Sequence, residues 1–514
     1  MAERIKIAII GGGTAGWMTA AALASLATDR ICDLVLVESE AIGTVGVGEA
    51  TIPAIKDFND LLGIPERDFM RFTQATFKLG IEFSGWGRQN TSYIHPFGTF
   101  GDTIAGSDFH QQWLRFSHSA ETKPLEAYSL AVQMCRHNRF KFPGRKSGED
   151  TIATDSRFAY AYHFDAGLYA RYLRLFSERK GVRRIEGRIT GAQLNRDSGD
   201  IEGVLLKSGQ RIDADYFIDC SGFRSLLLGE RLGVRYESWK HWLPCDSAVA
   251  MPSERNPELP PVTRATAKAV GWQWQIPLQH RTGNGLVFQS GLMSEDEAVT
   301  SLQQSVGGHS GSRPRVIHFE AGKRSCSWYK NCIAIGLAAG FLEPLESTSI
   351  YLIQSAIAHF LALLPGKLAP PQLVREFNRQ VDLEYERARD FIILHYHLNQ
   401  RDDSELWHYC RSMNIPDSLR GRIDAFRKRG YIEQYRFGLF APPSWLSVMM
   451  GQGLMPEKAD PLSATVDTTL AQRTMAEQFE AVQQALGTMV SSREFVGNYC
   501  ATAPMETAAL ETTK

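Results

Sequence analysis

The chain has 514 residues, enough for about two to four structural units. Charged residues make up 22% of it and leave a net charge of -1, which excludes a strong field for nucleic acid or an anionic membrane and favours a small, weakly charged partner. The eight cysteines lack metal-type spacing, and no apolar run is long enough to span a bilayer, so we expect a cytoplasmic protein with reduced thiols and no signal peptide.

The N-terminal residues predict a βαβ unit that binds a dinucleotide. Residues 5–10 form a short apolar run typical of a buried parallel strand, the alanine-rich residues 18–26 predict a helix, and residues 33–38 predict a second strand ending in an acid. The glycine turn at 11–16 lets backbone N–H groups approach a pyrophosphate at the helix N-terminus, and the acid suits an adenosine ribose. The predicted contacts are Gly11, Gly13, Thr14, Ala15, Gly16 and Glu38.

Three later segments extend this domain. Residues 204–206, 214–220 and 332–335 have the pattern of strands, and the last two end in turns of small residues. In their order they resemble the returning segments of FAD domains of the glutathione reductase type. The predicted fold class is therefore α/β, or α+β, with a mixed sheet.

The C-terminal part has a different pattern. Residues 374–394, 405–413 and 471–486 carry apolar side chains at helical spacing among charges. We therefore predict an FAD-binding core at 1–364, a mainly helical module at 365–500 that covers the substrate, and a flexible tail at 501–514.

Four segments are more specific than the glycine turn. They are Gly46-Val47-Gly48-Glu49-Ala50-Thr51-Ile52-Pro53, Phe77-Lys78-Leu79-Gly80, Trp272-Gln273-Trp274-Gln275-Ile276-Pro277 and Phe341-Leu342-Glu343-Pro344-Leu345-Glu346-Ser347-Thr348-Ser349-Ile350. Through them the chain resembles flavin-dependent halogenases of the tryptophan halogenase family, over nearly its full length. The resemblance implies that reduced FAD, oxygen and chloride or bromide yield hypohalous acid, which halogenates an electron-rich aromatic substrate.

Lys78 and Glu346 are the candidate catalytic residues. By pattern alone, Lys78 either reaches the surface or is buried for a purpose, and Glu346 either caps a helix that starts near Ser347 or serves chemistry. The resemblance implies that Lys78 binds hypohalous acid or forms a haloamine, and that Glu346 polarises the oxidant or accepts the proton lost by the ring. It also implies a halide site at Thr348 and Ser349, although many relatives have glycine in place of Ser349.

The resemblance assigns the remaining site residues. It implies that the W-x-W-x-I-P segment forms a wall that separates the flavin from the substrate. The implied wall and pocket residues are Trp272, Trp274, Ile276, Pro277, His95, Pro96 and Phe97, and the implied further FAD contacts are Glu49, Ala50, Ile189, Leu337 and Ile350. No metal is predicted, because His395 and His397 alone are a weak ligand set.

Partners and alternatives complete the prediction. A single dinucleotide motif implies a separate NAD(P)H-dependent flavin reductase. The segment 440–450 has no tyrosine pair to hold an amino acid, which favours an indole-like or larger aromatic substrate over free tryptophan. The halide preference and the oligomeric state, a dimer included, stay open, as do two alternatives: an FAD-dependent aromatic hydroxylase and a non-catalytic FAD-binding protein.

Overall fold

A six-stranded sheet in the order β20-β21-β12-β1-β2-β8 forms one side of the molecule in the computed structural model, which describes residues 4–27, 31–41, 49–144, 157–307, 313–435 and 438–501. Its strands are β1 (Ile5–Ile10), β2 (Cys32–Glu38), β8 (Arg183–Glu186), β12 (Tyr216–Asp219), β20 (Trp328–Tyr329) and β21 (Cys332–Ala334). The helix α1 (Thr14–Leu26) packs on β1 and β2, and α7 (Ala166–Arg179) packs on α1. β1 pairs in parallel with both β2 and β12, and β21 pairs with β12 in parallel. The predicted βαβ opening is therefore confirmed, except that α1 begins at Thr14 rather than near residue 18, because the end of the glycine turn is already helical.

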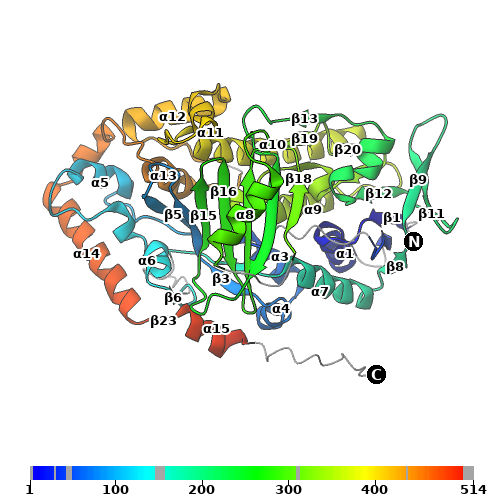
Figure 1. The fold of residues 1–514 in the computed structure, drawn as a ribbon, viewed down its shortest axis with the longest axis horizontal. Helices are drawn as coiled ribbons and strands as arrows, with labels where there is room; N and C mark the ends of the chain where they lie inside the picture. The colour runs from blue at the N-terminus through cyan, green and yellow to red at the C-terminus, as the bar shows by residue number, and fades with distance from the viewer. Residues whose placement is uncertain are drawn as a thin grey trace.

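A seven-stranded sheet in the order β18-β14-β17-β16-β15-β4-β5 occupies the middle of the molecule (Figure 1). Its strands are β4 (Gly80–Ser84), β5 (Ser92–Pro96), β14 (Ser247–Ser253), β15 (Thr263–Lys268), β16 (Gly271–Pro277), β17 (Thr282–Phe288) and β18 (Arg315–His318). β15 pairs with β4 in parallel and with β16 antiparallel, so the sheet is mixed.

Smaller sheets join distant parts of the chain. They are β3 (Thr76–Lys78) with β7 (Ala161–His163); β9 (Ile189–Leu194), β10 (Ile201–Leu206) and β11 (Arg211–Asp213); β13 (Tyr236–Ser238), β19 (Gly322–Arg324) and β22 (Gly340–Phe341); and β6 (Arg139–Phe140) with β23 (Val490–Ser491). Besides α1 and α7, the α-helices described before the C-terminal part are α3 (Ala54–Leu62), α4 (Glu66–Phe72), α5 (Phe109–Phe116), α6 (Leu130–Arg136), α8 (Glu295–Ser305) and α9 (Ser349–Ala362).

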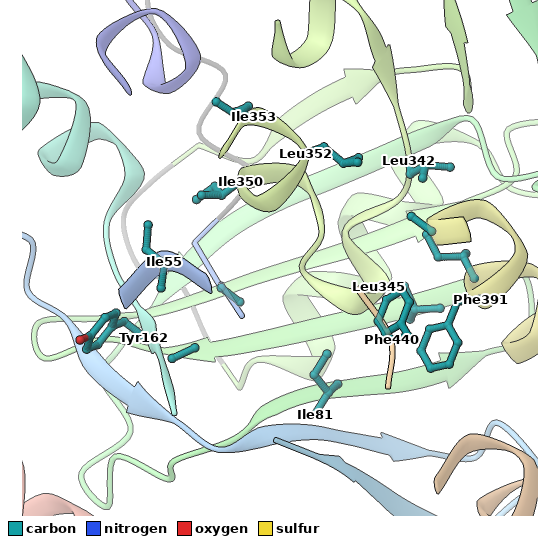
Figure 2. Packing of buried hydrophobic residues seen from close by; sticks show 14 of the residues in the cluster. Ile55, Ile81, Tyr162, Leu342, Leu345, Ile350, Leu352, Ile353, Phe391 and Phe440 are labelled. Atoms are coloured by element: carbon teal, nitrogen blue, oxygen red, sulfur yellow. The ribbon is translucent and has the colours of Figure 1, made fainter. Parts of the chain in front are cut away.

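The C-terminal part is mainly helical, as predicted. Its helices are α10 (Pro371–His397), α11 (Glu405–Ser412), α12 (Asp417–Arg429), α13 (Pro442–Gly451), α14 (Thr468–Gly487) and α15 (Ser492–Cys500). One hydrophobic cluster runs from β1 through α9 into α10, and Figure 2 shows Ile350 and Leu352 of α9 in the same core as Phe391 and Phe440. The helical part therefore shares a continuous core with the strands, and the division at residue 365 stays a prediction.

Two sequence predictions concern residues that the structure does not describe. Residues 46–48 of the second glycine segment and residues 502–514 of the predicted tail lie outside the described residues. Over the residues that are described, no helix has the length and apolarity of a membrane span.

Candidate active site

The glycine turn opens onto a cavity of about 920 Å³ at the carboxyl end of β1. Gly11 has a φ of +108°, and a Cβ there would lie 2.3 Å from the carbonyl oxygen of Cys220. The cavity is of a size that suits a large cofactor, and the free N–H groups at the start of α1 suit a pyrophosphate, so the residues present fit FAD. The predicted cofactor residues that line it are Gly11, Gly13, Thr14, Ala15, Glu38, Ile189, Leu337 and Ile350.

Gly16 has a packing role, and its contact with FAD stays a prediction. It does not line the cavity, and a Cβ on it would lie 1.8 Å from the carbonyl oxygen of Gly11, so glycine lets α1 approach the turn closely. Glu38 stands at the end of β2, where its Oε1 accepts a hydrogen bond from Arg184 Nε at 2.5 Å. A ribose would therefore share this carboxylate with an arginine.

A second, much smaller cavity lies beside the first. Its lining includes Trp272, Trp274 and Ile276 of β16 and Ser347 of the turn before α9, and Ser349 borders both cavities. Glu49 and Ala50, which we predicted to contact FAD, line this small cavity and not the large one. Ser349, the first residue of α9, therefore lies between the large cavity and the small cavity beside the two tryptophans.

Lys78 is buried at the end of β3, with no exposed surface. Because side chains alternate along a strand, Phe77 packs on Phe140 at 4.1 Å between ring centroids while Lys78 faces the opposite side. Its Nζ donates to the carbonyl oxygen of Thr51 at 2.9 Å and to Ser347 Oγ at 2.8 Å. Burial lowers the pKa of Lys78 to about 7, so the amine is partly neutral near neutral pH.

Glu346 lies between two imidazoles. Its Oε2 is 2.8 Å from His95 Nδ1 and its Oε1 is 2.6 Å from His395 Nε2, and the carboxylate is 1% exposed. Burial raises the pKa of Glu346, but the two imidazoles outweigh burial and lower it to about 2. Glu346 and Lys78 form no direct ion pair, since none is present within 4.0 Å between these two described residues.

The turn between Glu346 and α9 has the features of an anion site. Ser347 has a φ of +58°, and Thr348 follows as the N-cap of α9. The Oγ1 of Thr348 is buried without a hydrogen-bond partner, and the first N–H groups of a helix have no partner within the helix. Thr348 and Ser349, the residues predicted to bind the halide, therefore lie at a helix start where backbone and hydroxyl donors are free.

Trp272 and Trp274, the residues predicted to form the wall, both lie on β16. The rings of Trp272 and Trp274 lie 6.0 Å apart, and Trp272 Nε1 donates to Glu343 Oε2 at 2.8 Å. Burial raises the pKa of Glu343 to about 7. Pro277 lies beyond the wall, where its carbonyl oxygen accepts from Thr76 Oγ1 and so ties β16 to β3.

The predicted pocket residues on β5 and just after it differ in the groups that they contact. Pro96 pairs with Gly80 in the sheet, and the ring of Phe97 lies 5.2 Å from Lys78 Nζ. His95 does more than line a wall, because its Nδ1 contacts Glu346 directly.

Three residues of this site escaped the sequence prediction. They form a chain in which Gln452 Nε2 contacts Tyr93 OH at 3.2 Å and Tyr93 OH contacts His395 Nδ1 at 2.9 Å. From the sequence, His395 is singled out only as part of a weak metal-ligand set with His397. Among the described residues there is no cluster of His, Cys, Asp or Glu able to hold a metal. No local pattern links these positions, because His395 is 302 residues away from Tyr93 and 49 from Glu346.

Comparison with known proteins decides the family. A family model described as tryptophan halogenase matches residues 6–468. The chain belongs to the tryptophan halogenase family. Tryptophan 6-halogenase SttH from Streptomyces toxytricini is 34% identical over 514 residues, which cover 95% of this chain and 97% of that protein.

Solved structures of this family have the same fold. Xcc4156, a flavin-dependent halogenase from Xanthomonas campestris, is 42% identical with a TM-score of 0.93 and covers 98% of this chain and 99% of that one. BrvH, a flavin-dependent halogenase from Brevundimonas sp. BAL3, is 42% identical with a TM-score of 0.92 and covers 97% and 100%. The protein is therefore a flavin-dependent halogenase that uses FAD and a halide, and the hydroxylase and non-catalytic alternatives are not favoured.

Proposed function

We propose that Lys78 and Glu346 are the catalytic residues of this halogenase and that its substrate is an uncharged, indole-like aromatic. The observation that carries the proposal is the complete burial of Lys78, whose Nζ meets Ser347 Oγ in the turn that connects Glu346 to the halide residues. A buried amine with a pKa of about 7 is both a hydrogen-bond donor and a nucleophile near neutral pH.

Each group of the site has one task in this proposal. Bound reduced FAD, with oxygen and halide, supplies hypohalous acid. Thr348 and Ser349 hold the halide at the start of α9, where N–H groups stabilise an anion. Trp272 and Trp274 keep the aromatic substrate away from the flavin, and Lys78 holds the oxidant beside the substrate.

The substrate class follows from the packing of residues 438–451. Phe440 is 6% exposed and stacks on Phe391 at 3.8 Å between centroids, and Trp445 is 1% exposed. Arg422, the cation beside Trp445, already pairs with Glu433. This region supports an apolar aromatic better than the charged ends of a free amino acid.

The cofactor supply and the cellular site complete the proposal. A separate NAD(P)H-dependent flavin reductase delivers reduced FAD, because the sequence has one dinucleotide motif. The eight unpaired cysteines support a reducing compartment such as the cytoplasm. Chloride and bromide both fit an anion site made of backbone and hydroxyl donors, and we propose that both are used.

The experiment is a reaction of the purified protein with FAD, NADH, a flavin reductase, oxygen and bromide, with indole and tryptophan in equal amounts. Mass spectrometry should detect brominated indole in excess of brominated tryptophan. Preferential bromination of tryptophan would refute the substrate class. A repeat with chloride tests the halide proposal, and an unchanged yield in the Lys78→Ala variant would refute the role of the lysine.

A further inference from the structure

His95 has the geometry of a general base held by a carboxylate. Its Nδ1 contacts Glu346 Oε2 at 2.8 Å, and its Nε2 has no hydrogen-bond partner among the residues that the structure describes. An ionised carboxylate only accepts hydrogen bonds, so the neutral imidazole carries its proton on Nδ1 and leaves a lone pair on Nε2. A carboxylate, an imidazole and a free Nε2 form the same arrangement that activates the histidine of a Ser-His-Asp triad.

Each oxygen of Glu346 is already in contact with an imidazole. Its second oxygen is 2.6 Å from His395 Nε2, and His395 is fixed in turn. Gln452 Nε2 lies 3.1 Å from the carbonyl oxygen of His395, which only accepts, so the amide nitrogen faces this carbonyl and Tyr93 OH. Tyr93 OH therefore receives a hydrogen bond from Gln452 and donates its own to His395 Nδ1, and His395 Nε2–H then donates to Glu346.

His95 borders the same ring as the lysine. The ring of Phe97 lies 6.4 Å from the His95 ring and 5.2 Å from Lys78 Nζ, so both groups approach one small region. The rings of Phe391 and Phe440 pack around His95 at 5.5 and 6.2 Å. These apolar neighbours strengthen the contact between His95 and Glu346.

We propose that His95, through Nε2, takes the proton that leaves the aromatic ring, and that Glu346 acts through it. This inference rests on the proposed function and deepens it. The ring carbon donates an electron pair to the halogen, whose bond to oxygen or nitrogen at Lys78 breaks with its electrons. The C–H bond then breaks, its electron pair restores the aromatic ring, and the proton goes to His95 Nε2. The resulting imidazolium is stabilised by Glu346 and later releases its proton to water.

The first test is an isotope effect on bromination with indole deuterated at its ring carbons as the probe. In the wild type, proton loss to His95 is fast, and no primary isotope effect is expected. In His95→Gln, which can still donate to Glu346, the rate should fall roughly 10²–10⁴-fold and a primary isotope effect should appear, because proton loss becomes limiting. A slower variant without any isotope effect would overturn the proposal. His397→Gln is the matched control, because the described hydrogen bond of the His397 side chain is with the carbonyl oxygen of Cys410 and involves no member of the Glu346 cluster.

The second test needs no turnover and no variant activity. NMR of the ¹⁵N-histidine-labelled wild type, with the His95 signal assigned by its loss in His95→Gln, should show a protonated Nδ1 and a bare Nε2. A proton on Nε2 would overturn the proposal even if indole is not a substrate. Absence of brominated indole with the expected tautomer would instead count against the substrate class alone.

Discussion

The flavin cavity and the Lys78 cluster are built in opposite ways. The cavity is open, about 920 Å³ in volume, and is lined by residues at the ends of β1 and β12, at the start of α1 and on neighbouring segments. The cluster of Lys78, Glu346, His95 and His395 is closed, with every member at most 2% exposed, and is formed by side chains from β3, β5, α10 and the turn before α9.

The two regions are therefore sensitive to different kinds of substitution. A glycine turn that shapes a cavity is disrupted when a side chain is added to it, whereas a buried cluster is lost when one partner of a charged contact is removed. The variants below therefore separate flavin binding from halogen transfer.

The largest effect is expected for Lys78. Lys78→Ala should abolish halogenation because the oxidant loses its carrier, while FAD still binds, since Lys78 does not line the large cavity. Product yield and FAD binding by fluorescence should be measured together. Lys240→Ala, at an exposed lysine paired with Asp246, is the control. Loss of FAD binding in Lys78→Ala would show that the residue is structural.

Glu346→Gln should come next. The amide removes the charge between His95 and His395 and should slow turnover about 10¹–10³-fold without preventing FAD binding. The turnover rate at saturating substrate is the measurement. A variant with the full wild-type rate would remove Glu346 from the mechanism.

Gly11→Ala tests the other region. The added Cβ would meet the carbonyl oxygen of Cys220 at 2.3 Å, and the φ of +108° is strained for alanine. We expect FAD affinity to fall by about tenfold or more, which corresponds to at least ~1.4 kcal/mol. Gly191→Ala is the matched control, because no heavy atom lies within 4 Å of its added Cβ. Equal FAD affinities in the two variants would contradict the role of the turn.

The pH dependence of stability tests the burial of Lys78. Burial lowers its pKa from 10.5 to about 7, so between these values the unfolded chain binds more protons than the folded one and stability rises with pH. Lys78→Met lacks this rise, so its stability advantage over the wild type should be largest near pH 7 and should shrink toward about pH 9. Melting temperatures of both proteins provide the measurement, and parallel curves would refute the shifted pKa.

The smallest effect is expected for Tyr93→Phe. It removes one hydrogen bond to His395 Nδ1, two contacts away from His95, and should lower the turnover rate about threefold to tenfold. A Tyr409→Phe variant, which loses a hydrogen bond to the carbonyl oxygen of His241 at the surface, should keep the wild-type rate. Equal rates in all three proteins would show that the orientation of His395 has no influence on turnover.

The sequence indicated the flavin region far better than the cluster. The strand, turn, helix and acid from Ile5 to Glu38 are neighbours along the chain, so their spacing alone predicts the βαβ unit. Glu49 and Ala50 line the small cavity because β16 and the turn before α9, both distant in sequence, form the walls around them, and their contact with FAD stays a prediction.

The sequence by itself determined the family and the cofactor fold and gave Lys78 and Glu346 as candidate catalytic residues, because glycine turns and short motifs act through neighbouring residues. Only the tertiary structure decided that Glu346 is shared by His95 and His395, and that Gln452 and Tyr93 set the proton positions of His395. The physical reason is that hydrogen bonds between buried side chains depend on distances in space, and residues 302 or 359 positions apart carry no local signal of their contact.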